Sequence, residues 1–277
     1  MSDERTYPAG VPCWVDTEQP DVDAARDFYA SLFGWTYFDA IPADAPGTYL
    51  IASLDGATVA AIGPSQGDAP VEWNTYIAVE DADADAAAVR AAGGTIELDP
   101  VDAGPGGRLA ACVDPRGARF RLWQPRRRLG VQLTNVPGSW NFSDLHTADA
   151  AAATAFYAPL FGWEFDDLGF ATLIRRPGYG DHLEATVYPD IKKVQSEVSA
   201  PPGFEDAIAW MALEQQGHPE RWEVTFAVAD RDESAAIAES LGATVVATAD
   251  DHWTKNATVR DPQGAQFVLS QFSPPAN

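Results

Sequence analysis

The sequence predicts an α+β fold of four β-α-β-β-β modules, paired into two domains with curled, mostly antiparallel sheets. Two repeated phrases support this prediction. Residues 28–35 read FYASLFGW and residues 156–163 read FYAPLFGW, so they differ at one position. The turn sequence DPRGARFRLWQ at 114–124 returns as DPQGAQFVLSQ at 261–271. Two independent repeats of this kind indicate an internal duplication of the chain.

The composition is that of a globular and strongly acidic protein. The 277 residues include 41 acidic and 18 basic side chains, which gives a net charge of −23. Such a surface repels phosphate backbones and anionic lipids, so we expect neither nucleic acid nor a membrane as a partner. No apolar run has the length of a membrane span, and the N-terminus lacks a signal-peptide core, so we expect a cytoplasmic protein. Cys13 and Cys112 are then expected to be free thiols.

The first domain, residues 1–125, is predicted to contain modules at 11–65 and 71–125. In the first module a strand over 11–17 precedes a helix over 21–33, which begins at two aspartates and ends at Gly34. Phe28 and Tyr29 share the apolar face of this helix, so we expect them in the core rather than in a site. Further strands follow, with a hairpin turn at 55–56.

The second domain, residues 138–277, is predicted to repeat this plan. Its modules are expected at 138–190 and 220–272, and residues 189–209 are an insertion that the first domain lacks. The insertion is expected to cover a site, to contact the other domain or to elaborate the surface. Residues 126–137 are interpreted as the linker, and their three arginines as a solvated face or a clamp on acidic surfaces.

The repeated modules, with FY-x-x-L-FGW at the end of the first helix and DP-x-G-x-x-F before the last strand, resemble the vicinal oxygen chelate superfamily. This superfamily includes glyoxalase I, bleomycin-resistance proteins and extradiol dioxygenases. The resemblance covers residues 11–125 and 138–272 and is greatest to two-domain glyoxalase-like proteins of actinobacteria. It implies that each pair of modules forms a cup that holds the substrate. It also implies a divalent metal in active members, bound by ligands from the first and last strands of each module.

Strand alternation predicts which side chains of the first domain face the cup. They are Trp14, Asp16, Asn74, Tyr76, Arg119, Arg121 and Trp123. The family's ligand positions correspond to Trp14, Ala60, Asn74 and Arg121, none of which is a carboxylate or an imidazole. We therefore expect no metal of the family type here. The set suits a planar or anionic small ligand. Alternatively, the arginines pair with nearby aspartates and close the cup.

The second domain leaves more alternatives. A strand over 182–189 would turn His182, Glu184 and Thr186 toward the cup, and the neighbouring strands would add Asp144, Glu223 and Thr225. The ligand positions correspond to Phe142, Glu184, Glu223 and Val268. Glu184, Glu223 and His182 are the predicted catalytic residues, whereas Asp144 and Thr225 are predicted ligand contacts. Two acidic positions fit either a rearranged metal site or an acid/base pair.

Three hypotheses of function follow from the residues and the resemblance. The first is a small-molecule-binding protein of the glyoxalase and bleomycin-resistance type that lacks the usual metal. It would act by ligand binding or as a metal-independent lyase or isomerase. The second is a divalent-metal-dependent lyase or isomerase whose site lies only in the second domain. The third is a structural or signalling protein whose cups are filled by their own side chains. A monomer and a homodimer are both compatible with the sequence, and whether the protein is an enzyme is left open.

Overall fold

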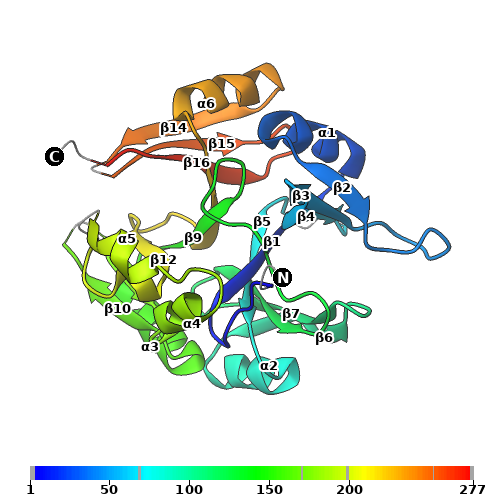
Figure 1. Cartoon of the computed structure of the whole chain (residues 1–277). Coiled ribbons are helices and arrows are strands. Elements are labelled where there is room, and N and C mark those ends of the chain that lie inside the picture. Colours follow the sequence, from blue (N-terminus) through cyan, green and yellow to red (C-terminus); the bar gives the residue numbers. More distant parts are fainter. Residues whose placement is uncertain (1–3, 68–69, 170, 198–199, 252, 275–277) are drawn as a thin grey trace. The chain divides into compact units, whose positions relative to one another are not determined.

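The computed structural model describes residues 4–67, 70–169, 171–197, 200–251 and 253–274. Its strands form two eight-stranded mixed sheets accompanied by helices, so the α+β prediction is confirmed (Figure 1). The first sheet has the strand order β2-β3-β4-β1-β5-β8-β7-β6, and the second has the order β10-β11-β12-β9-β13-β16-β15-β14. No helix in the described ranges is long and apolar enough to cross a membrane.

The first sheet is built from the first half of the chain. Its elements are β1 (Pro12–Gln19), α1 (Val22–Phe33), β2 (Thr36–Asp39), β3 (Leu50–Leu54), β4 (Ala57–Pro64), β5 (Trp73–Ala78), α2 (Ala82–Ala91), β6 (Thr95–Asp102), β7 (Gly107–Val113) and β8 (Arg119–Pro125). The hairpin between β3 and β4 turns at Asp55 and Gly56, both with positive φ, as the sequence predicts.

The second sheet is built from the second half. Its elements are β9 (Trp140–Thr147), α3 (Ala150–Phe161), β10 (Glu164–Asp167), β11 (Thr172–Arg175), α4 (Tyr179–Ala185), α5 (Ile191–Glu197), a 3-10 turn (Phe204–Asp206), β12 (Ala207–Leu213), β13 (Arg221–Ala227), α6 (Arg231–Ser240), β14 (Thr244–Asp250), β15 (Thr254–Arg260) and β16 (Gln266–Phe272).

The helices that end in the repeated phrase are bounded alike. Asp21 caps α1 by accepting a hydrogen bond from the Ala24 amide, and Asp149 caps α3 by accepting one from Ala152. Both helices end at a glycine in the left-handed region, Gly34 with φ of 73° and Gly162 with φ of 67°. The repeated octapeptide therefore fixes the C-terminus of each helix.

The chain divides into two compact units that each combine modules from both halves. The first unit comprises Met1–Trp14, Thr75–Gly130 and Ser143–Trp222, and the second comprises Val15–Asn74, Val131–Phe142 and Glu223–Asn277. Thus the second and third modules share one unit, and the first and fourth share the other. The predicted domain limits of 1–125 and 138–277 follow the sheets instead. Cys13 and Cys112 are buried, unbonded thiols, as expected.

The core of the second unit contains a hydrogen-bonded chain of three side chains. The Trp73 indole donates to the Tyr29 hydroxyl at 2.9 Å, and Tyr29 donates to Asp261 Oδ2 at 2.8 Å. Asp261 Oδ1 accepts the backbone amides of residues 263–265, which form its own turn. Phe28 and Tyr29 are 6% and 0% exposed, so their predicted core placement is confirmed.

The first unit repeats this arrangement with its own residues. Trp222 donates to the Tyr157 hydroxyl at 3.0 Å, and Tyr157 donates to Asp114 Oδ2 at 3.0 Å. Burial raises the pKa of the Tyr157 hydroxyl, which therefore stays protonated and able to donate. We call each set a Tyr–Asp–Trp relay. Each relay joins the repeated octapeptide of one module to the repeated DP turn of another.

The strand predicted over 182–189 is wrong. Residues 179–185 form α4 instead, and the strand that completes the third module is β12 at 207–213. Tyr179 and Leu183 are buried and Val187 packs partly on the same core, so the apolar residues recur every four positions. That is a helical period rather than the period of two assumed for a strand. The inserted segment therefore lies between β11 and β12, inside the third module.

Candidate functional site

The first unit carries an arginine held against a tyrosine on adjacent strands. Tyr76 of β5 and Arg121 of β8 are register partners in a parallel pair. The Arg121 Nη1 donates to the Tyr76 hydroxyl at 2.8 Å, and its Cζ lies 5.4 Å from the centre of the Tyr76 ring. Trp123, two residues further along β8, meets the Tyr76 ring edge-on at 6.2 Å. Side chains two apart on a strand share a face, so these three residues form one group.

A second cation–aromatic pair extends this part of the first unit. Arg128 lies with its Cζ 5.5 Å from the Trp14 ring, and its carbonyl accepts the Trp123 indole N–H at 2.9 Å. Gly107 permits this packing, since a Cβ there would lie 2.7 Å from Trp123 and 2.5 Å from the Gln124 carbonyl oxygen. In the arginine run, expected as a solvated face or a clamp, Arg126 forms an ion pair with Asp102 at 2.8 Å.

Arg119 has a different environment from Arg121. Its guanidinium forms an ion pair with Glu97 at 3.1 Å, and both side chains are 42% exposed. The alternative expectation was pairing with aspartates, whereas the partner of Arg119 here is a glutamate. An ion pair as exposed as this contributes little to stability.

The second unit holds a buried carboxylate that accepts two side-chain hydrogen bonds. Asp16 is 1% exposed and Asn74 is 8% exposed. Asn74 Nδ2 donates to Asp16 Oδ1 at 2.9 Å, and the Tyr49 hydroxyl donates to Asp16 Oδ2 at 2.8 Å. A buried carboxylate requires such partners, because its desolvation is otherwise costly. The structure therefore brings together two of the predicted ligand contacts.

Tyr49 was not singled out from the sequence. It lies at the end of the connection between β2 and β3, where Asp39 Oδ1 accepts its backbone amide at 3.0 Å. Its ring passes close to Gly63, where a Cβ would lie 3.2 Å from Cδ2. Asp39 also accepts the Thr48 hydroxyl at 2.5 Å. An aspartate followed nine residues later by Thr-Tyr is the only trace of this arrangement in the sequence, and it is too weak to predict a contact.

Two of the acidic residues predicted for the second half, Asp144 and Glu223, lie on β9 and β13. Glu223 is 5% exposed and accepts a hydrogen bond from Gln266 Nε2 at 2.5 Å. Thr225 is also buried and is the register partner of Val268. Asp144 Oδ1 accepts the backbone amide of Trp210 at 3.1 Å.

His182 and Glu184 lie on α4 rather than on a strand, so the strand alternation from which they were assigned to the cup does not apply to them. Glu184 is on α4, where its Oε2 pairs with Lys192 at 2.8 Å and both side chains are 43% exposed. His182 Nε2 lies 3.1 Å from the Thr6 hydroxyl oxygen and 3.0 Å from the Thr6 carbonyl oxygen. Thr186, assigned to the same strand, caps the C-terminus of α4.

His146 and His218 share one carboxylate. His146 Nδ1 lies 2.9 Å from Glu214 Oε1, and His218 Nδ1 lies 3.1 Å from Glu214 Oε2. Arg221 is 3.3 Å from the same carboxylate. The hydrogen bond with His146, opposed by partial desolvation and aided by Arg221, lowers the pKa of Glu214. The arginine makes this cluster a poor host for a cation.

The family's metal does not fit the residues at its ligand positions. Among the described residues, no group of three or more histidine, cysteine, aspartate or glutamate side chains is arranged to hold a metal ion. Position 121 carries a guanidinium, and positions 14, 60, 142 and 268 carry apolar side chains. With Glu184 on a helix, the third module supplies no carboxylate from the strand where one was expected.

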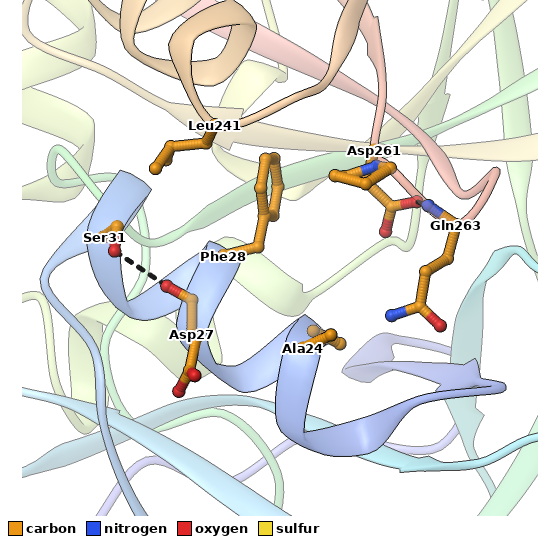
Figure 2. Close-up of a pocket in the computed structure, with 9 residues that line it drawn as sticks. Ala24, Asp27, Phe28, Ser31, Leu241, Asp261 and Gln263 are labelled. Carbon is orange, nitrogen blue, oxygen red and sulfur yellow. Dashed lines mark hydrogen bonds between the residues drawn. The ribbon is translucent and has the colours of Figure 1, made fainter.

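A separate cavity of about 340 Å³ lies in the second unit between α1 and the Asp261 turn. Figure 2 shows the Phe28 ring between Leu241 and the side chains of Asp261 and Gln263. Its walls are mostly apolar, and the Asp261 oxygens already accept hydrogen bonds from Tyr29, Gln19 and the turn amides. This cavity is therefore a gap beside the relay and offers little for chemistry.

Comparison with known proteins identifies both halves of the chain as glyoxalase-like. Residues 19–122 match the model of the Glyoxalase/Bleomycin resistance protein/Dioxygenase superfamily, and residues 142–270 match that of the Glyoxalase-like domain. The putative glyoxylase CFP32 of Mycobacterium tuberculosis is 35% identical over 99% of both chains. The anthracycline biosynthesis protein DnrV of Streptomyces peucetius is 31% identical, over 96% of this chain and 94% of its own.

Solved structures show the same fold at much lower identity. The Mn(II)-bound glyoxalase from Novosphingobium aromaticivorans has a TM-score of 0.60 at 17% identity, covering 95% of this chain and 82% of its own. A catechol 2,3-dioxygenase has a TM-score of 0.54 at 13% identity, covering 98% and 90%. At these identities the likeness concerns the fold, because members of one fold carry out different reactions.

Proposed function

Because the chain belongs to the vicinal oxygen chelate superfamily of glyoxalases, bleomycin-resistance proteins and dioxygenases, we propose that it binds a small organic molecule without the family's divalent metal. It acts by ligand binding or as a metal-independent lyase or isomerase. The ligand binds on the sheet faces that carry the predicted contacts. The protein works in the cytoplasm, where its two buried thiols stay reduced.

The observation that carries the proposal is the environment of Arg121. This residue stands where the family's metal sites usually have a glutamate, and its guanidinium donates a hydrogen bond to Tyr76 on the neighbouring strand. Two positive charges at contact distance repel each other, and the repulsion grows where water is excluded. A guanidinium here therefore opposes a divalent cation and favours an anionic or electron-rich ligand.

The relatives support a ligand of the small-molecule kind. One group is named as putative glyoxylases and the other for anthracycline biosynthesis. Both names concern the chemistry of small organic compounds. A structural protein with cups filled by its own side chains receives no comparable support.

The proposal is tested by measuring metal content and ligand binding on the same preparation. The full chain is purified without chelator or metal-affinity tag and analysed by inductively coupled plasma mass spectrometry. We expect far less than one equivalent of any divalent ion per chain. One tightly bound ion per chain would overturn the proposal.

The second measurement is thermal unfolding with a panel of aldehydes, aromatic acids and polycyclic phenols, with and without EDTA. A ligand at a hundred times its Kd stabilises the native state by about 2.7 kcal/mol, which is easily detected. We expect at least one stabilising compound whose effect persists in EDTA. A panel without effect would favour the structural alternative, and an effect abolished by EDTA would favour a metal site.

A further inference from the structure

We infer that residues beside the two relays determine which modules of the chain pack together, the first with the fourth and the second with the third. This inference goes beyond the proposed function and concerns an interaction within the chain. Both relays use a tyrosine, an aspartate and a tryptophan in the same roles. The relays alone would therefore also fit an exchanged pairing, in which each octapeptide packs on the DP turn of its own half.

In the first unit, the DP turn is fastened through a buried carboxylate. Arg116, the third residue of the turn, donates to Glu220 Oε1 from Nη2 at 3.1 Å and from Nε at 3.3 Å. The same oxygen accepts the Ala148 amide at 3.1 Å, directly before the residue that caps α3. The Glu220 side chain is only 6% exposed, so its charge requires the guanidinium as a partner. We call these contacts the Arg116 clasp.

In the second unit, the equivalent turn is fastened by a neutral amide. Gln263 stands where Arg116 stands in the repeated turn sequence. Its Oε1 accepts the Asp21 amide at 2.7 Å, and its Nε2 donates to the Asp21 carbonyl oxygen at 2.8 Å. Both bonds reach the residue that caps α1. We call these contacts the Gln263 clasp.

The positions around each turn differ in the same sense as the turn. By the octapeptide alignment, Pro20 stands where Ala148 stands, and proline has no amide hydrogen to be accepted. By alignment of the two relay tryptophans, Val71 stands where Glu220 stands, and valine has no charge that needs a partner. Val71 lies beside the second turn, 4.0 Å from a Cβ placed on Gly264. Each clasp is therefore a matched set of residues in its own unit.

The exchanged pairing would leave charged and polar groups without partners. With the turn of the second module on α1, Arg116 would meet Val71, and the Asp21 amide would lose its acceptor because a guanidinium accepts no hydrogen bond. With the turn of the fourth module on α3, Glu220 would meet the neutral Gln263 and lose its cation. A buried carboxylate without a cation is strongly unfavourable. The clasps thus favour the native pairing, which the relays do not distinguish.

The pairing can be read from the distance between spin labels on α1 and α6 of the full chain. Ser31 of α1 and Leu241 line the same cavity of the second unit, and Glu239 is an exposed residue of α6 two positions before Leu241. Ser31→Cys/Glu239→Cys is labelled with a nitroxide in the native state, in which the two natural thiols are buried. The labelled chain is unfolded in urea and refolded, and the dipolar coupling is measured by electron paramagnetic resonance. The native pairing gives one short distance, whereas an exchanged pairing gives a longer one because α1 then packs beside the second module.

The main variant makes the two clasps alike. Arg116→Gln/Glu220→Val gives the first unit the residue types of the second, and it removes both members of the ion pair so that no buried charge is left. We expect a second, longer distance after refolding. Arg116→Lys keeps the charge and should keep the single distance. Arg90→Met is the matched control and should also keep it, since Arg90 is an exposed arginine of α2 paired with Asp99.

Gln263→Arg makes the same comparison from the second unit. It places an arginine in both turns and removes the acceptor of the Asp21 amide. A longer distance should therefore appear in this variant as well. This variant decides the question if the double variant does not refold.

Either result bears directly on the inference. A single short distance in refolded Arg116→Gln/Glu220→Val or Gln263→Arg would overturn it, as would a longer distance in the wild type or in Arg90→Met. Circular dichroism and melting curves establish that each variant is folded before the distances are compared. The proposed function is tested separately by metal content and ligand binding, so either conclusion can fail without the other.

Discussion

The two copies of the Tyr–Asp–Trp relay are nearly identical. The two strand faces that bear Arg121 and Val268, in contrast, differ in their side chains. The relays keep the same three residue types and nearly the same distances, 2.8 Å from Tyr29 to Asp261 and 3.0 Å from Tyr157 to Asp114. The strands that follow the DP turns keep their apolar, helix-facing residues. They differ at the alternate positions, where Arg121 and Trp123 correspond to Val268 and Ser270.

This difference follows from how strongly a substitution destabilises the fold at each place. In a relay, the three side chains are buried and hydrogen-bonded to one another, so a substitution removes hydrogen bonds from buried groups. At the alternate positions the two strands make different contacts, since Arg121 of β8 donates to Tyr76 and Gln266 of β16 donates to Glu223. The duplicated scaffold therefore stays constant while the residues at the alternate strand positions change.

The largest effect is expected from removing a relay hydroxyl. Tyr157→Phe leaves Asp114 Oδ2 and the Trp222 indole without their shared partner, which should lower the free energy of unfolding by about 2–3 kcal/mol. Tyr29→Phe should cost less, about 1–2 kcal/mol, because Asp261 Oδ2 still accepts a hydrogen bond from Gln19 Nε2 at 2.8 Å. Urea unfolding of the two variants measures this difference.

Tyr188→Phe provides the control for the relay variants. Tyr188, between α4 and α5, is 39% exposed, so loss of its hydroxyl should leave the unfolding midpoint nearly unchanged. If Tyr29→Phe proved as costly as Tyr157→Phe, the extra bond from Gln19 would be irrelevant. If neither variant were destabilised, the buried hydrogen bonds would not explain why the two relays are alike.

A smaller and pH-dependent effect is expected where the second half has acquired its own polar cluster. By the octapeptide alignment, His146 corresponds to Glu18, and His146 pairs with Glu214 of the second half. The hydrogen bond with His146 holds the pKa of Glu214 below its ordinary value of 4.5. A carboxyl with a lowered folded-state pKa stabilises the protein above its unfolded-state pKa, and this contribution is lost as the pH falls through the folded-state value.

Glu214→Gln should therefore be less stable than the wild type at pH 7, by about 0.5–1 kcal/mol. The difference should disappear as the pH falls below the ordinary glutamate value of 4.5. Denaturant titrations from pH 7 to pH 3 measure it, with Glu239→Gln as an exposed glutamate control on α6. A difference that persisted at pH 3 would show that shape rather than charge is responsible.

The sequence was sufficient for the fold because its signals were local and repeated. The octapeptide and the DP turn predict the helix ends, the turns and the helix-facing residues, and Ile77, Val79, Phe120 and Leu122 are all buried as expected. What the local pattern could not supply was the partner of each module. The relay from Tyr29 to Asp261 joins residues from opposite ends of the chain, and no periodicity indicates such a contact.

The candidate site was predicted less completely than the fold. Strand alternation correctly grouped Arg121, Tyr76 and Trp123, because neighbouring strands in register place such residues together. It missed Tyr49, which reaches Asp16 through a connection whose path depends on Asp39. Strand alternation also failed for His182 and Glu184. Over so short a span, the apolar residues from 179 to 187 fit either a strand or a helix. Only burial of Tyr179 and Leu183 decides between them.

The smallest effect is expected for Glu184, which the sequence favoured as a catalytic residue. Its partner Lys192 also binds Asp181, at 2.6 Å, so the lysine keeps a partner when Glu184 is replaced. Exposed ion pairs of this kind contribute little. Glu184→Gln should therefore leave the unfolding midpoint and the metal content unchanged. Glu223→Gln is the matched substitution at a buried glutamate, where the bond from Gln266 is lost or rearranged and the midpoint should fall. If Glu184→Gln alone lost ligand binding or bound metal, the functional site would lie in the second half of the chain rather than beside Arg121.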